Sequence, residues 1–180
     1  IGASFANGVL SISLSLIAQY IISQLLGKTT ALQLMDLSRP DHPLLQELLI
    51  KAPGTYQHCL QVANLAEQAA KEVQGDALLI RVGALYHDVG KTMNPGFFIE
   101  NQLPGKMDTH EDMDPVLAAA TIIQHVSDGI KLAKKHRLPP QIQSFIQEHH
   151  GKTLTRFKGS EGREENGSEE RIEQSMFQYP

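Results

Sequence analysis

The sequence predicts an all-α protein, a helical bundle preceded by a membrane-spanning helix. Two observations carry this prediction. Apolar residues recur at helical spacing almost throughout from Leu44 onward, and residues 8–26 form an apolar run without a charge. Capping residues, glycines and prolines divide the body into separate helices, and neither a convincing strand pattern nor an internal repeat is present.

Length and composition set the outer limits. The 180 residues are 41% hydrophobic and 20% charged, enough for one medium-sized domain with its own core. The single cysteine, Cys59, cannot form an internal disulfide, so nothing indicates an oxidising compartment. The net charge of -4 leaves no electrostatic footprint for a nucleic-acid polymer. Residues 158–173 hold three basic and six acidic residues and account for most of that charge.

Residues 1–27 are the expected membrane segment. Residues 8–26 would form a helix roughly 28 Å long, close to the thickness of a bilayer core. A signal peptide is disfavoured because no basic residue precedes the run. Two alternatives stay open: the serines at 11, 13 and 15 alternate with apolar residues as in a strand, and six polar residues suit a buried soluble helix. Lys28 suits a cytoplasmic exit.

The remaining elements follow in order. Residues 28–43 are expected to be a linker with a short helix over 31–37, since Gly27, Pro40 and Pro43 punctuate it. Thr55 and Asp76 are expected to cap two of the helices of the body, and Pro115 to begin another. Residues 158–180 are expected to be a polar insert and the end of the domain. The body, residues 44–157, should contain helices over 44–50, 55–73, 77–89, 115–135 and 139–150, with a loop over 92–114.

Five histidines and one aspartate carry the functional prediction: His58, His87, Asp88, His125, His149 and His150. Any one of these histidines alone would be interpreted as a solvated surface residue. Their positions argue otherwise, because His58 and His149 lie on apolar helix faces and the helix ending in His87 and Asp88 is apolar nearly all round. The six side chains are therefore expected to point to the interior from four helices.

Such a cluster is costly to bury unless it binds metal. Imidazole nitrogen and carboxylate oxygen suit a divalent cation, and the absence of thiolate disfavours a structural zinc site. Six ligands exceed the needs of one catalytic ion, so we expect two ions bridged by Asp88, an arrangement suited to in-line displacement at phosphorus.

Other polar residues are less decisive. Lys91 follows the metal-bearing helix directly, where its ammonium would either hold a substrate phosphate or meet the dipole at the helix end. His42 and His136 are expected to be solvated. His110, in an acidic loop, would help to close the site without acting as a ligand.

The ordered set of histidines, with its flanks, resembles the HD-domain metal phosphohydrolases. The stretches 52–56, 86–91, 97–102 and 148–151 are similar to one branch, the seven-transmembrane HD-domain receptors, which are bacterial cyclic di-AMP phosphodiesterases. The resemblance covers nearly the whole chain. It places the apolar run at the last membrane helix of that family, in the cell membrane, with the HD domain in the cytoplasm.

The resemblance also implies roles for individual residues. The six residues named above would bind two Mn or Fe ions, with Asp88 and Lys91 in the catalytic machinery and Lys91 a phosphate contact. One phosphodiester of cyclic di-AMP would be hydrolysed, giving linear pApA. Tyr56 and residues 97–102 are candidates for the adenine pockets, because aromatic rings stack on bases, although Phe97 and Phe98 also suit a core.

The sequence departs from the family pattern at two places. The family carries a further metal-binding Asp on a later helix, which has no counterpart before Pro180, so the chain is expected to be a fragment. The acidic loop of this chain reads Asp108-Thr109-His110-Glu111, where the family pattern has Asn-Pro-His-Asp.

Residues 151–154, Gly-Lys-Thr-Leu, disfavour the branch that cleaves cyclic di-GMP. An HD phosphohydrolase for another nucleotide and a non-catalytic nucleotide sensor remain alternatives, and a homodimer is compatible with the sequence.

Overall fold

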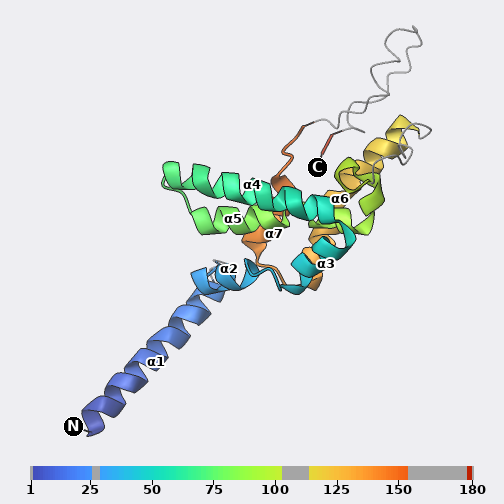
Figure 1. The fold of residues 1–180 in the computed structure, drawn as a ribbon. Coiled ribbons are helices and arrows are strands. Elements are labelled where there is room, and N and C mark those ends of the chain that lie inside the picture. The colour runs from blue at the N-terminus through green and yellow to red at the C-terminus, as the bar shows by residue number, and fades with distance from the viewer. Residues whose placement is uncertain (1, 26–28, 103–113, 154–177, 180) are drawn as a thin grey trace.

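A slender helix projects from a compact group of shorter helices in the computed structural model (Figure 1). The structure describes residues 2–25, 29–102, 114–153 and 178–179. Every regular element within these ranges is helical, which confirms the predicted class. The elements are α1 (Gly2–Leu25), α2 (Ala31–Leu37), α3 (Pro43–Lys51), α4 (Pro53–Glu72), α5 (Ala77–Tyr86), the 3-10 turns η1 (Val89–Met93), η2 (Pro95–Phe97) and η3 (Ile99–Asn101), α6 (Pro115–Lys135) and α7 (Pro140–Glu148).

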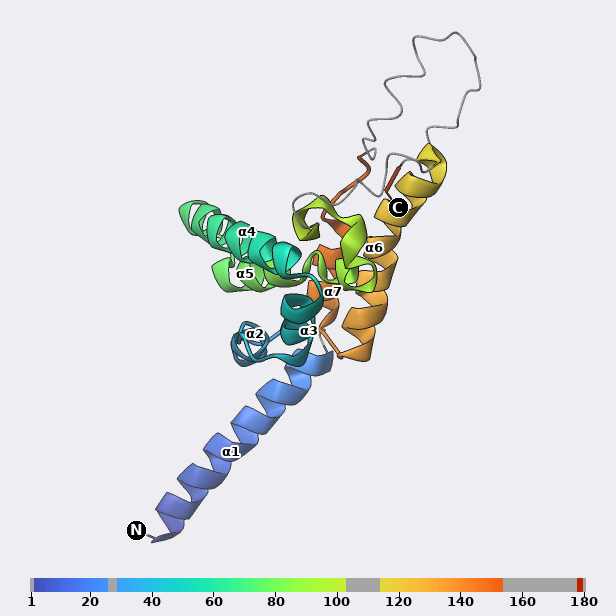
Figure 2. The ribbon, with the colours of Figure 1, turned by 45° about the vertical axis from the view of Figure 1, so that its right-hand side comes forward.

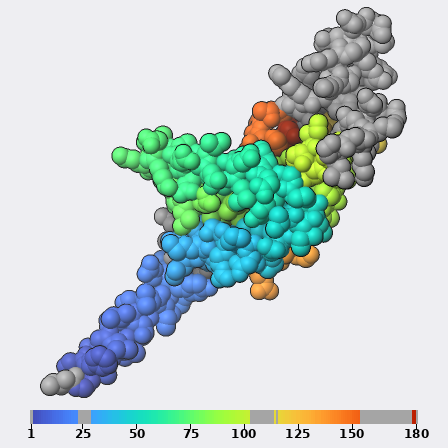
Figure 3. All heavy atoms as spheres, in the orientation of Figure 1, coloured from blue at the N-terminus to red at the C-terminus, as the bar shows by residue number. Residues whose placement is uncertain are grey.

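The N-terminal run forms one helix that stands clear of the body. Residues 2–22 of α1 are all exposed, and the space-filling view shows them as a rod leading away from the remaining helices (Figure 3). The strand and the buried soluble helix are therefore both wrong for this segment. By length and composition the helix could cross a membrane.

The core is built around α5. Every side chain from Val82 to Tyr86 is buried, as its nearly continuous apolar sequence predicts, and α4, α2 and α7 all contact this helix. α2 belongs to the core as well, since Leu34 and Leu37 are buried within it. The segment expected as a linker is thus packed against the body through these two leucines.

Helix α6 crosses the turn that follows α5, as the rotated view allows the reader to follow (Figure 2). Gly90 lies at the crossing, where an added Cβ would stand 1.8 Å from the carbonyl oxygen of His125. Only a residue without a side chain permits this approach of two backbones. The contact brings the end of α5 against the middle of α6, and this junction sets the position of the candidate site.

Several predicted boundaries hold and two are wrong. Asp76 caps α5 through the backbone N–H of Leu79, and the helices over 31–37 and 115–135 begin and end where predicted. Thr55 is not the cap of α4, because the helix already begins at Pro53. The helix predicted over 77–89 ends at Tyr86, since the chain must turn for Gly90 to meet α6. Residues 158–173 lie outside the described part.

Candidate metal centre

The centre of the site is the carboxylate of Asp88. It stands at the start of η1, directly after the end of α5, and is 3% exposed. Its Oδ1 atom is buried and has no hydrogen-bond partner among the residues that the structure describes. An ionised oxygen left in this state is costly, so the environment must offer a cation or protons.

Three histidines around Asp88 make the same kind of backbone contact, each with the carbonyl oxygen three residues earlier. The Nδ1 atom of His87 lies 2.7 Å from the carbonyl oxygen of Ala84, three residues earlier, and that of His149 lies 2.9 Å from the carbonyl oxygen of Ile146. His125 makes the same contact with Ile122. A carbonyl oxygen can only accept, so each Nδ1 carries the ring proton and each neutral ring presents a lone pair at Nε2. A hydrogen bond from the ring nitrogen that does not bind the ion is typical of histidines that ligate metals.

The three Nε2 atoms converge on the carboxylate. That of His87 lies 3.2 Å from Oδ2 of Asp88, while those of His125 and His149 lie 3.4 and 3.5 Å from Oδ1. The Nε2 atoms of His125 and His149 are 3.4 Å apart. Neutral rings would thus direct lone pairs at one another and at an anion, which is repulsive unless protons or a cation intervene.

These separations fit a metal ion. Neighbouring ligand atoms about 2.0–2.1 Å from a common ion are about 2.8–3.4 Å from one another in octahedral or tetrahedral arrangements. Two sets of potential ligand atoms lie within 4.8 Å of one another and share Asp88: Asp88, His125, His149 and His150, and His58, His87 and Asp88. The chain therefore brings together all six of the residues predicted as ligands.

His58 and His150 lie at the two ends of the cluster. The side chain of His58 is 47% exposed, and its Nε2 atom is 3.9 Å from Asp88, so the expectation that it points to the interior is wrong. The buried face of α4 instead carries small side chains such as Cys59 and Ala63, which let α5 pack closely. His150 stacks on Tyr179, with ring centroids 3.9 Å apart, and its buried Nε2 has no partner within the described ranges.

The pKa values show how strongly these groups interact. Burial alone would raise the pKa of Asp88, but the surrounding imidazoles lower it well below its usual range. Burial would lower the pKa of His87, but Asp88 and the Cys59 thiol outweigh it and raise the pKa to about 10. Burial and the nearby His149 and His125 lower the pKa of His150 to about 4. Without a metal the cluster therefore holds a proton on His87, which a bound ion would displace.

With the geometry established, comparison with known proteins identifies the fold family. The family model described as the HD domain matches residues 55–175, which is more than half of the chain. The chain belongs to the HD-domain family.

The relatives of this HD domain include two cyclic-di-AMP phosphodiesterases. It is 37% identical to the cyclic-di-AMP phosphodiesterase PgpH of Listeria monocytogenes over 92% of the chain, and 39% identical to that of Bacillus subtilis over 86%. It spans only 23% and 21% of these proteins. The crystal structure of the L. monocytogenes PgpH HD domain in complex with cyclic-di-AMP superposes with a TM-score of 0.70 at 39% identity, covering 79% of this chain and 64% of that one.

Lys91 lies at the rim of the HD-domain site. Its Nζ atom is 2.9 Å from Oδ2 of Asp88 and 2.8 Å from Oε1 of Glu100. The ring of Phe98 lies below the ammonium, 4.9 Å from Nζ to the centroid, and stands edge-on to His125. The lysine thus turns toward the cluster, and Phe98 forms a wall beside it.

Sequence reasoning missed three residues beside the site. Glu100 holds Lys91, and Thr55 binds Glu100 from the first turn of α4. Glu100 falls within the stretch that resembles the family, which was the available signal. Tyr179 covers His150 from a position 29 residues later, and neither spacing nor periodicity indicates that contact.

Two further residues, Tyr56 and His110, are predicted to take part in the site. The ring of Tyr56 is half-buried and packs against the hydrophobic core. His110 lies outside the described residues. The structure therefore adds no support for either in binding.

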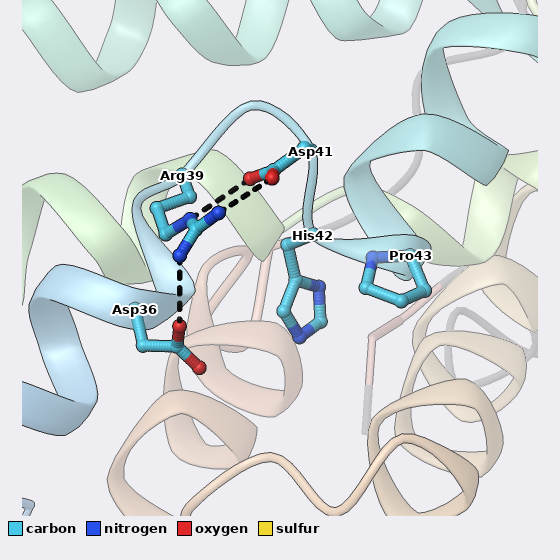
Figure 4. Close-up of a pocket in the computed structure, with 5 residues that line it drawn as sticks. All are labelled: Asp36, Arg39, Asp41, His42 and Pro43. Atoms are coloured by element: carbon cyan, nitrogen blue, oxygen red, sulfur yellow. Dashed lines mark hydrogen bonds and ion pairs between the residues drawn. The ribbon is translucent and has the colours of Figure 1, made fainter.

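A second pair of histidines, His42 and His136, lies near α2 and α3. Both are partly buried, so the expectation that they are solvated is wrong. His42 stands edge-on to Tyr86, with ring centroids 5.6 Å apart, and 6.5 Å from His136. A shallow surface pocket beside His42 contains Arg39, which pairs with Asp36 and Asp41 (Figure 4).

Proposed function

We propose that this chain is the HD domain of a metal-dependent phosphodiesterase that hydrolyses cyclic di-AMP to pApA. The convergence of three Nε2 lone pairs on the buried carboxylate of Asp88 is the observation that supports it most. Two relatives named cyclic-di-AMP phosphodiesterases, and the crystal structure of such a domain with that nucleotide, support this substrate.

Two divalent ions, Mn or Fe, fit the donor set. His125, His149 and His150 would hold one ion, His58 and His87 the other, and Asp88 would contact both. Ions so placed supply Lewis-acid polarisation of the phosphodiester and an activated water. The exposed position of His58 leaves its end of the cluster accessible to solvent and substrate.

The chain's own residues bind and orient the substrate. Lys91 places its ammonium 2.9 Å from the carboxylate of Asp88 and would hold a non-bridging phosphate oxygen as a point charge. Phe98 is buried beside His125 and limits water on that side. Tyr56 is retained as an adenine contact on the resemblance alone.

The N-terminal helix would anchor the enzyme. We propose that α1 spans the cell membrane through residues 8–26 and that the HD domain lies in the cytoplasm. The exposed apolar surface of α1 and the similarity to PgpH support this arrangement. The serines and glutamines of α1 would then contact neighbouring membrane helices.

Turnover by the full chain in detergent with Mn2+ tests the function. Cyclic di-AMP, cyclic di-GMP and cyclic GMP-AMP are assayed separately, and we expect pApA from the first. Asp88→Ala and His87→Ala should abolish both metal content and activity. Lys91→Ala should lower kcat/KM by about 10–100-fold, the effect of losing a charged contact worth about 1.5–3 kcal/mol, with metal retained.

Lys131→Ala is the matched control, because this lysine is exposed and pairs only with Asp128 on its own helix among the described contacts. It should retain full activity. If the chain, extended through the later Asp of the family pattern and loaded with metal, hydrolyses none of the three nucleotides, the proposed activity is wrong, and a sensor or an enzyme for another nucleotide remains. If Lys91→Ala removes the metal, its phosphate role is wrong.

A further inference from the structure

Lys91 has two carboxylate partners, and they differ in what they can do once metal is present. The side chain of Asp88 is buried, and its carboxylate belongs to both sets of metal-ligating atoms. Metal ions bound to it would repel a neighbouring ammonium. Glu100 belongs to neither set and is 28% exposed, so it stays free to pair with Lys91.

Glu100 is itself held from α4. Its Oε1 atom accepts hydrogen bonds from both Lys91 Nζ, at 2.8 Å, and the Thr55 hydroxyl, at 3.0 Å. The side-chain amide of Asn101 bonds to Thr55 twice, accepting from its backbone N–H and donating to its hydroxyl. Both partners of Glu100 are therefore charged or oriented donors, and the carboxylate has little freedom to turn away.

The backbone fixes the same junction. An added Cβ at Gly54 would stand 1.8 Å from the carbonyl oxygen of Glu100, so η3 lies directly on the first turn of α4. His58 follows one turn later on that helix. The position of Glu100 is thus tied to the helix that supplies one predicted metal ligand, and not to a free loop.

We propose that Glu100 is a positioning residue that keeps the ammonium of Lys91 at the rim of the metal-loaded site, directed at the substrate phosphate. The proposal rests on the proposed function, since it gives Lys91 its phosphate to bind. Glu100 contacts neither metal nor substrate in this role and acts only through Lys91.

A double-mutant cycle tests this dependence. Glu100→Gln keeps the size of the side chain and an acceptor for Thr55 but removes the charge. We expect it to lower kcat/KM for cyclic di-AMP about 10-fold, mainly through KM, with metal content and melting temperature unchanged. Lys91→Ala combined with Glu100→Gln should be no worse than Lys91→Ala alone, because the two residues act as one unit. Glu100→Asp, which keeps the charge, should recover part of the loss.

A second readout is independent of activity. Acylation of individual lysines by an amine-reactive reagent, followed by mass spectrometry of the Mn2+-loaded chain, should show Lys91 reacting several-fold faster in Glu100→Gln than in the unsubstituted chain. Lys131 in the same sample is the internal reference. Glu47→Gln, which breaks the surface pair with Lys51, is the control variant and should change neither activity nor the reactivity of Lys91.

The outcomes separate the two proposals. Multiplicative losses in the double variant, or metal loss in Glu100→Gln, would overturn the positioning role even if the chain is a phosphodiesterase. Unchanged reactivity of Lys91 would overturn it as well. If no nucleotide is hydrolysed but Lys91 still becomes more reactive, the proposed function fails while the ion pair stands.

Discussion

Two groups of histidines lie at the end of α5: the metal-centre cluster around Asp88, and the pair of His42 and His136. Their rings are held in opposite ways. Tyr86 turns toward His42, and the next residue, His87, turns toward Asp88. In the metal-centre cluster the Nδ1 atom of His87 donates to a carbonyl oxygen, so Nε2 is the nitrogen that faces Asp88. In the pair of His42 and His136, Nδ1 of His42 accepts a hydrogen bond from the backbone N–H of Leu44, so the proton of the neutral His42 ring is on Nε2.

The carboxylates differ as well. Asp88 is buried in the middle of its imidazoles, whereas Asp36 and Asp41, near His42, are exposed and paired with Arg39 (Figure 4). Nε2 of His136 is 3.8 Å from Glu47 and makes no hydrogen bond within the described part of the chain. Proximity of histidines and acids is therefore not sufficient for a metal site. The rings must be held through Nδ1 so that several Nε2 lone pairs meet one buried carboxylate.

The largest expected effect tests this difference directly. His149→Ala removes one of the converging lone pairs and should weaken Mn2+ binding by more than the about 10–100-fold that loss of an outer-shell partner costs a metal site. His42→Ala removes a ring of the same kind from the other group and should leave the affinity unchanged. Isothermal titration with Mn2+ measures both. Equal losses in the two variants would mean that His42 contributes to metal binding and that the contrast in tautomers is irrelevant.

The second effect concerns the packing that holds Asp88 in place. Gly90→Ala forces a methyl group against the carbonyl oxygen of His125 and should destabilise the domain by about 1–3 kcal/mol, as overpacking does. Gly96→Ala adds the same group where, apart from its chain neighbours, no atom of the described residues lies within 4 Å of the added carbon, and should change stability by less than about 0.5 kcal/mol. Urea unfolding of both variants measures the difference.

Metal binding should follow the same order. Because Gly90 sets the distance between the Asp88 turn and α6, Gly90→Ala should also weaken Mn2+ binding, whereas Gly96→Ala should not. Full stability together with full Mn2+ affinity in Gly90→Ala would show that the crossing has room to relax and does not position the carboxylate.

The same two regions explain what could be predicted from the sequence. Apolar spacing and the local cap at Asp76 are properties of neighbouring residues, so most of the helices were predictable. The six clustered residues were predictable because the helix faces and the family resemblance agree on them. The early end of α5 was not, because it depends on Gly90 meeting α6, a contact between segments far apart in the chain.

Burial was harder to predict than helix formation for the same reason. The exposure of His58 depends on which face of α4 packs against α5. The buried face is the one that carries small residues such as Cys59 and Ala63. His42 and His136 come from different elements and become partly buried only when α3, α5 and α6 assemble. The pairing of Glu100 with Thr55 and Lys91 likewise needs the first turn of α4 beside η3.

The smallest expected effect is on the pH dependence of stability. The slope of the free energy of unfolding against pH should have opposite signs for His87 and His42. In the metal-free chain the pKa of His87 rises from 6.5 to about 10, so the folded state binds more protons than the unfolded state between these values. Its contribution to stability is complete below pH 6.5 and is lost as the pH rises toward 10. Burial and the neighbouring His136 lower the pKa of His42 below 6.5, against the opposing charges of Asp36 and Asp41. Below pH 6.5 the unfolded state therefore binds the additional proton, and stability rises with pH.

Urea unfolding of the chain in EDTA from pH 5 to 10 separates the two contributions. Subtracting the profile of His87→Gln from that of the unsubstituted chain should leave a difference that falls with pH above 6.5. The corresponding difference for His42→Gln should rise with pH below 6.5 and stay flat above it. Each slope is limited to about 1.4 kcal/mol per pH unit, the effect of one proton, and solvent screening should make that of His42 smaller. Slopes of the same sign would mean that both rings respond to burial alone, and that the carboxylate of Asp88 does not set the charge of its cluster.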